Sequence, residues 1–149
     1  MIGQRLLRKE DPRLLTGRGR YLADHDVPGL LHVSMVRSPV AHAHVRGIDT
    51  AAAARVPGVA VVLTQDDLDA AGARRMSHLL PIPGIQSLEW GLLASDRVRF
   101  VGEPVAAVVA TSRAIAEDAA ELVEVHYDSL PALTDPFAAL EPGAGLLYP

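Results

Sequence analysis

Residues 104–127 read PVAAVVATSRAIAEDAAELVEVHY, and this stretch decides the fold. Its first part, Pro104–Ala110, is a run of small and β-branched apolar residues, which is typical of a buried strand. The pair Thr111-Ser112 supplies side-chain oxygens that can cap a helix start. Alanines at helical spacing then predict a helix to about Leu122. From Val123 to Tyr127, apolar and polar residues alternate, so a strand follows this helix.

Four more strands are predicted upstream, the last of them the short run Val98–Phe100 before the Gly102-Glu103 turn. Leu30–Val36 alternates, and we expect a half-buried strand with Leu31, Val33 and Met35 on its apolar face and the polar His32 and Ser34 on the other. A second candidate strand, Val40–Ile48, alternates less clearly. The apolar run Val59–Leu63 predicts a third, buried strand.

The helices between these strands are short. Asp49 or Thr50 can cap a helix over Ala51–Ala54, which Pro57-Gly58 ends. Thr64 caps a second helix from Gln65 to Ala71, with Asp67 at its third position. Since no regular strand–helix–strand period appears, the sequence predicts an α+β domain with a mixed sheet and short helices.

Composition excludes several functional classes. The chain has 149 residues, a net charge of −4, 4% aromatic residues and no cysteine. It therefore lacks disulfides, iron–sulfur ligands and a cysteine nucleophile. The acidic balance and the scarcity of stacking aromatics argue against nucleic-acid binding. No apolar run approaches the length of a membrane span, and Met1–Glu10 is too charged for a signal peptide, so we expect a cytoplasmic protein.

Two segments outside the predicted elements interrupt this pattern. Residues 1–26 are polar and form an N-terminal arm, while residues 27–141 make up the domain and 142–149 a C-terminal linker. Within the domain, Gly72–Asp96 has no clear period. A loop of that length in a compact domain is usually functional or disordered.

Two motifs suggest ligands but are incomplete. Gly17 and Gly19 resemble the start of a dinucleotide loop, but Leu22 occupies the third glycine position and no strand precedes them. His42 and His44 share a face if they lie on a strand, so both could reach one metal ion. A third ligand is not evident nearby, and His32 or Asp49 would serve only if the fold brings one of them close. A surface or interface pair is the alternative, and the one we favour.

Two charged residues have open roles. Glu103, between Gly102 and Pro104, is either an exposed bulge residue, which we favour, or a carboxylate turned towards a cleft. Arg37, before Ser38-Pro39, either anchors an anion or covers an apolar edge with its stem, and we favour the second role.

Several spaced segments resemble one family. They are RLLTGRGRYLADHDVPGLLHVSMVRSPVAHAHVRGID (13–49), VPGVAVVLTQDDL (56–68) and LLASDRVRFVGEPVAAVVATSRAIAEDAAELVEVHYDSLPALTD (92–135). In this order they resemble the N-terminal α/β-hammerhead domain in the molybdenum-binding large subunit of the xanthine dehydrogenase, aldehyde oxidase and carbon monoxide dehydrogenase family. The most specific pieces are Arg37-Ser38-Pro39 with Ala41-His42-Ala43, and VGEPVA at 101–106. His44 departs from the family, which usually has Arg or Lys there.

The resemblance implies an oxidoreductase that hydroxylates aldehydes or N-heterocycles, or oxidises carbon monoxide. It implies a molybdopterin cofactor held by later domains, with iron–sulfur and FAD subunits as further partners. The catalytic and cofactor-binding residues of the family lie downstream, so none is assigned here. The hammerhead portion then packs against the molybdopterin-binding domains and shapes the approach of substrate. We expect these contacts at Gly72–Asp96 and at two short segments: Arg37, Ser38, Pro39, Gly102, Glu103 and Pro104.

Two other functions remain open at this point. The chain could be an enzyme by itself, through a metal at His42 and His44 or acid–base chemistry at Glu103. It could instead be a stand-alone binding or interaction module without redox activity. A biotin- or lipoyl-type carrier needs a lysine at a hairpin tip, whereas the single lysine, Lys9, lies in the N-terminal arm.

Overall fold

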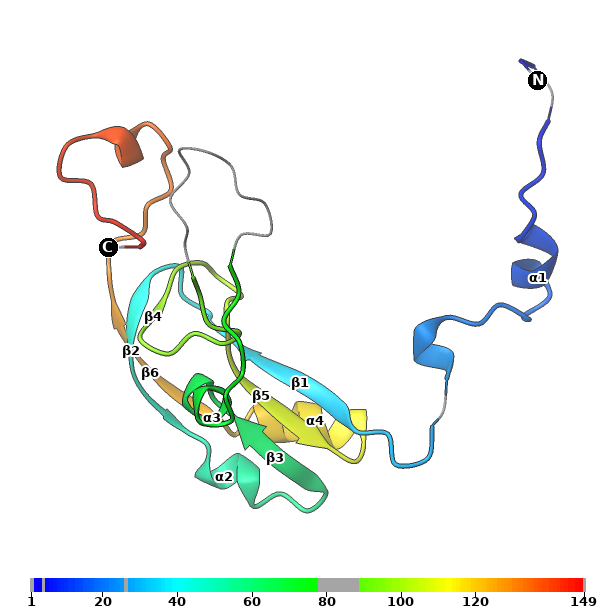
Figure 1. Ribbon diagram of the computed structural model, residues 1–149, viewed down its shortest axis with the longest axis horizontal. Coiled ribbons are helices and arrows are strands. Elements are labelled where there is room, and N and C mark those ends of the chain that lie inside the picture. Colours follow the sequence, from blue (N-terminus) through cyan, green and yellow to red (C-terminus); the bar gives the residue numbers. More distant parts are fainter. Residues whose placement is uncertain (1, 4, 26, 78–88, 149) are drawn as a thin grey trace. The chain divides into compact units, whose positions relative to one another are not determined.

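The computed structural model describes residues 2–3, 5–25, 27–77 and 89–148 (Figure 1). The chain divides into two compact units, Met1–Leu30 and Leu31–Pro149. The first contains a short helix that the sequence analysis did not predict, α1 (Asp11–Leu15), and a single 3-10 turn, η1 (Leu22–Asp24). Neither element has a buried residue, so the first unit has no apolar core in its helices.

The second unit contains two three-stranded sheets, both antiparallel. In the first sheet β5 (Pro104–Ala110) lies between β1 (His32–Arg37) and β3 (Val59–Leu63). In the second sheet β2 (Ala43–Asp49) lies between β4 (Arg97–Val98) and β6 (Glu124–Ser129). The α+β class with short helices is confirmed, but two antiparallel sheets replace the expected mixed sheet. The reason is that β1 and β3 each pair antiparallel with β5, while β2 pairs with β4 and β6 in a separate sheet.

The predicted helices are present. They are α2 (Ala51–Ala54), α3 (Gln65–Ala70) and α4 (Arg113–Ala120), and a short 3-10 helix, η2 (Ala138–Leu140), lies near the C-terminus. Ser112 Oγ caps α4 by accepting a hydrogen bond from Ile115 N at 3.2 Å. Thr64 N and Oγ1 both donate to Asp67 Oδ2 at 2.7 Å, which closes the start of α3. These local side-chain bonds explain why the helices begin where the sequence predicts.

The core has two parts. Ala106 and Val108 of β5 pack with Ala119 of α4, and each of these three side chains is fully buried. Ala43, Val98 and Val105 form the second cluster, which includes residues of both sheets. Small side chains on facing elements allow close approach, so the alanine-rich sequence still builds a dense core.

The predicted orientation of β1 is wrong. Val33 and Met35 are 55% and 44% exposed, while the alternate residues Ser34 and Val36 point inward. The register explains this difference, because Ser34 lies opposite the buried Val108 of β5, and α4 packs against this face. The helix therefore selects which face of the strand is buried.

Candidate functional site

The six residues predicted as interdomain contacts meet at one place, where β1 ends and β5 begins. Arg37 lies opposite Pro104 in the β1–β5 register. Beyond this pair, Ser38 N donates to Glu103 O at 2.9 Å, and Gly102 N donates to Ser38 O at 2.8 Å. We call this arrangement of residues 37–39 and 102–104 the contact junction. Its two halves are far apart in the sequence, so only sheet pairing brings them together.

Arg37 and Gly102 hold the junction closed. The Arg37 guanidinium donates from Nη1 to Gly102 O at 2.9 Å, while its side chain stays exposed. Gly102 has a φ of 89°, a conformation in which a side chain would be strained. Neither of the two roles considered for Arg37 describes this contact, because its head group fastens the turn onto the end of β1.

Ser38 and Pro39 differ in accessibility. Ser38 is 2% exposed, and its hydroxyl both donates to Val40 O at 2.8 Å and accepts from Val40 N at 3.2 Å. This local turn satisfies the buried hydroxyl, which would otherwise be costly. Pro39 is exposed. Of the Arg37-Ser38-Pro39 segment, the serine therefore shapes the backbone and the proline faces outward.

Glu103 is turned inward, so the exposed-bulge alternative is wrong. Its side chain is only 13% exposed, and its Oε2 accepts a hydrogen bond from Arg99 N. Arg99 Nη1 lies 3.9 Å from Glu103 Oε1, and the guanidinium carbon lies 4.6 Å from the centre of the Tyr148 ring. The three side chains border a small cavity of about 60 Å³. These contacts of Glu103 with Arg99 suit a role in closing the turn before β5.

His42 and His44 line one cavity, of about 320 Å³, together with Arg97. His42 is 8% exposed, and its Nδ1 lies 2.9 Å from Pro131 O. Neither His32 nor Asp49 completes a site, because β1 belongs to the other sheet and Asp49 ends β2. Among the described residues, no group of three His, Cys, Asp or Glu side chains could hold a metal ion. The neighbouring guanidinium also disfavours a cation there.

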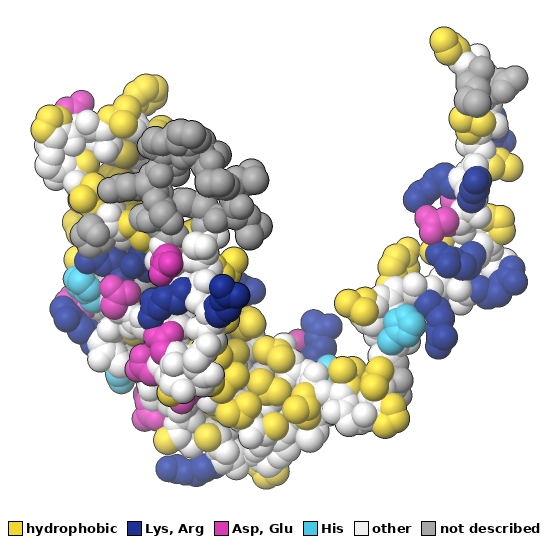
Figure 2. Space-filling model, in the orientation of Figure 1, with side chains coloured by type: hydrophobic (Ala, Val, Ile, Leu, Met, Phe, Trp, Pro, Cys, Tyr) yellow, Lys and Arg dark blue, Asp and Glu magenta, His cyan; other side chains and the backbone are white. Residues whose placement is uncertain are grey.

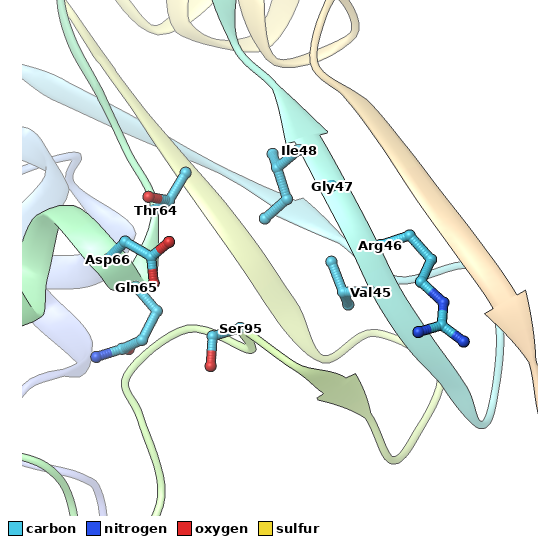
Figure 3. A pocket seen from close by; sticks show the side chains of 8 residues that line it. All are labelled: Val45, Arg46, Gly47, Ile48, Thr64, Gln65, Asp66 and Ser95. Carbon is cyan, nitrogen blue, oxygen red and sulfur yellow. The ribbon is translucent and has the colours of Figure 1, made fainter.

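A second cavity, of about 240 Å³, lies between β2 and the start of α3 (Figure 3). Thr64, Gln65 and Asp66 form one wall, and Val45 and Ile48 of β2 face them. Arg46 points away from the cavity (Figure 3) and makes an ion pair with Asp128 across the sheet at 2.6 Å. This pair holds the pKa of Asp128 below its usual range.

The sequence analysis missed Gln65 and Gly91. Gln65 is 2% exposed; its Oε1 accepts from Leu93 N at 2.8 Å and its Nε2 donates to Asp69 Oδ1 at 2.7 Å. A Cβ at Gly91 would lie 2.6 Å from Gln65 Oε1 and 2.7 Å from Leu93 O, so only glycine fits there without a shift. No local pattern distinguishes a buried glutamine at a helix start from an exposed one. Gln65 thereby fixes the end of the Gly72–Asp96 segment, whose residues 78–88 lie outside the described part of the chain.

Replacing Asp67 by asparagine should make the free energy of unfolding depend less on pH in the acid range. The hydrogen bonds from Thr64 hold the pKa of the Asp67 carboxyl below its ordinary value. A group whose pKa is lower in the folded state adds stability above its unfolded pKa and loses it as the pH falls through the folded value. Asp67→Asn should therefore cost up to about 1 kcal/mol at pH 7 and less at pH 3. Urea unfolding at both pH values measures this, and an equal loss at both would contradict it.

The remaining motif shows no ligand-binding geometry. Gly17 and Gly19 follow the short helix α1, not a strand, so the phosphate-cradling arrangement of a dinucleotide loop is not formed. Within the described ranges, no helix is long and apolar enough to cross a membrane.

The structure is an α+β domain of two antiparallel sheets, and its main candidate site is a junction held by backbone hydrogen bonds. The described residues contain no cluster that could hold a metal ion. Residues 16–131 match the family model described as "Aldehyde oxidase and xanthine dehydrogenase, a/b hammerhead domain". The chain therefore belongs to this hammerhead family, as the resemblance in its sequence implied.

Curated relatives and solved structures agree with this assignment. The nicotine 6-hydroxylase large subunit of Paenarthrobacter nicotinovorans is 48% identical over 96% of this chain and 17% of that protein. The carbon monoxide dehydrogenase large chain of Afipia carboxidovorans is 43% identical over 98% of this chain and 17% of the relative. The crystal structure of quinoline 2-oxidoreductase from Pseudomonas putida 86 aligns with a TM-score of 0.84 at 51% identity, over 93% of this chain and 18% of the solved one. The chain thus spans less than a fifth of the length of these relatives.

Proposed function

We propose that this chain is the hammerhead portion of the large subunit of a molybdenum hydroxylase of the aldehyde, xanthine or carbon monoxide oxidoreductase type. It packs against the molybdopterin-binding domains, shapes the approach of substrate and has no catalytic activity alone. One observation carries the proposal: relatives match almost all of this chain, but with less than a fifth of their own length.

Neither the cavity beside β2 nor the cavity at His42 and His44, both formed by described residues, fits molybdopterin. The cofactor binds through its metal, its pterin and its phosphate, and therefore needs a deep polar cleft with positive charge. The cavity beside β2 is open and is bordered by the Asp66 carboxylate, which would repel a phosphate. The cavity at His42 and His44 has a guanidinium, but its other walls are mainly apolar. We therefore propose that the molybdenum cofactor of the complete enzyme is held by domains outside this chain.

The contact junction supports the packing role. Pro39 and the turn residues Phe100 and Val101, 53% and 64% exposed, present apolar surface at one end of the first sheet. Hydrogen bonds on both sides hold the backbone there rigidly. We propose that six residues of the junction make interdomain contacts or hold the contacting residues in place: Arg37, Ser38, Pro39, Gly102, Glu103 and Pro104. The iron–sulfur and FAD subunits would belong to the same cytoplasmic assembly.

Association and metal content test this function. The chain is mixed with a separately expressed polypeptide that carries the molybdopterin-binding domains of the same large subunit, and the mixture is run on size exclusion. We expect a one-to-one complex, with molybdenum in the complex and none in the chain alone. No turnover of aldehydes or purines with an artificial electron acceptor is expected from the chain alone. Failure to associate, or turnover by the isolated chain, would contradict the proposal.

A further inference from the structure

The outer faces of the two sheets differ in polarity. Along β6 in the second sheet, Glu124, His126 and Asp128 are exposed while Val125 and Tyr127 point inward. This apolar-in, polar-out alternation is usual for an antiparallel sheet with one face in solvent. The outer face of the second sheet is therefore suited to contact with solvent along β6.

The first sheet lacks this alternation. Its inner face is covered by α4, which packs against β1, β3 and β5. Its outer face is apolar on all three strands: Val33 and Met35 of β1, Val109 and Ala107 of β5, and Val61 and Leu63 of β3. The register places Val33 and Val61 on either side of Val109, so these side chains form one continuous surface. We call these six residues the outer face.

The outer face is only partly open in this chain, because Ala107 on the central strand is 7% exposed. Val33, Met35 and Val61 are 55%, 44% and 42% exposed. In Figure 1 the helix α4 lies behind the sheet, and Figure 2 shows apolar side chains gathered over β1, β3 and β5 on the near side. A contiguous apolar patch on three strands marks a surface that another chain segment covers.

We infer that the outer face docks the molybdopterin-binding part of the same large subunit, which makes it the main hydrophobic contact of the hammerhead portion. The inference rests on the proposed function. More than four fifths of each relative lies outside the matched segment, so a large polypeptide is available to cover this face. The outer face also ends beside the contact junction, because Arg37 is the last residue of β1, just past a shift in the β1–β5 register, and fastens the Gly102 turn.

The surface that docks on the outer face should be apolar. A face of valine, methionine, leucine and alanine without a charged member binds an apolar, well-packed surface and rejects a charged one. The charged Arg37 lies at its end, where it can meet polar groups at the rim. A second copy of this chain offers the same apolar face, and self-association is therefore the competing occupant that the experiment must separate.

Charge substitutions test the docking face. Val33→Asp and Val61→Asp lie on the two edge strands, and each is expected to raise the Kd for the molybdopterin-binding polypeptide at least tenfold while melting stays within a few degrees of wild type. His126→Asp on the polar face of the second sheet is the matched control and should leave the Kd unchanged. Wild-type affinity in both valine variants would overturn the docking face while leaving the proposed function intact. No binding by the wild-type chain would instead refute the proposed function.

Oxidation of Met35 gives a readout that needs no variant. Peroxide should oxidise this exposed thioether in the free chain and at least fivefold more slowly in the complex. Sedimentation of the free chain should give a monomer. A dimer with Met35 already protected would show a second copy on the face and would overturn the inference, as would equal oxidation rates in the free and bound chain.

Discussion

Val108→Asp should unfold the chain at room temperature. Val108 is fully buried in the middle of β5, the central strand of the first sheet. It packs in the apolar cluster that contains Ala53 and Ala119, and Ser34, which lies opposite it on β1, has no charge to pair with a carboxylate. A carboxylate in that position either stays charged without compensation or takes up a proton, and both cost several kcal/mol. This is comparable to the whole free energy of unfolding of an ordinary domain, about 5–15 kcal/mol.

Circular dichroism and thermal melting measure this effect. Val109→Asp, one residue further along the same strand, is the matched control because its side chain points to the opposite, outer face. It should reduce the free energy of unfolding by about 1–2 kcal/mol, since the charge can reach solvent. A Val108→Asp chain that melts close to wild type would contradict the assignment of β5 as the buried central strand.

Gln65→Leu should cost about 2–3 kcal/mol although it places an apolar side chain of similar size in a buried site. The change removes the acceptor for Leu93 N and the donor to Asp69 Oδ1. Leu93 N–H would remain buried without a partner, and this desolvated donor is the main cost. Asp69 is affected less, because Arg75 still pairs with it at 2.6 Å.

The free energy of unfolding and amide exchange test this role. Asp66→Asn, at the adjacent exposed position on α3, should change stability by less than about 0.5 kcal/mol. In Gln65→Leu the amide of Leu93 should exchange with solvent faster than in wild type, while the amides of β5 should not. Unchanged Leu93 exchange would mean that the glutamine does not hold this segment.

The local part of the fold was predictable. β5, α4 and the capped start of α3 appear where the sequence places them, because strand propensity and capping depend on residues close in the chain. The family was predictable for a related reason, since spaced motifs on these elements survive in the sequence. Motifs also singled out the six residues that form the junction between β1 and β5, although their meeting there was not predicted; their role as interdomain contacts stays a prediction.

Side-chain direction was not predictable from the same information. The alternation in β1 shows that one face is apolar, but not which face α4 covers. The position of Glu103 between a glycine and a proline favours an exposed carboxylate, and only the placement of Arg99 beside it shows that the side chain turns inward. Gln65 carries no sign of burial, because its partner Leu93 is 28 residues away. Each of these depends on pairing between distant segments.

The amino-acid sequence by itself determined the elements, the family and the apolar character of the outer face. Only the tertiary structure decided that the contact junction forms and that the apolar residues of β1 point away from α4. The physical reason is that secondary structure follows from interactions within a few residues, whereas the orientation of a strand follows from sheet register and helix packing. Val33 and Met35 have the alternation of a buried face, yet in this chain they lie on the face opposite α4 and are 55% and 44% exposed.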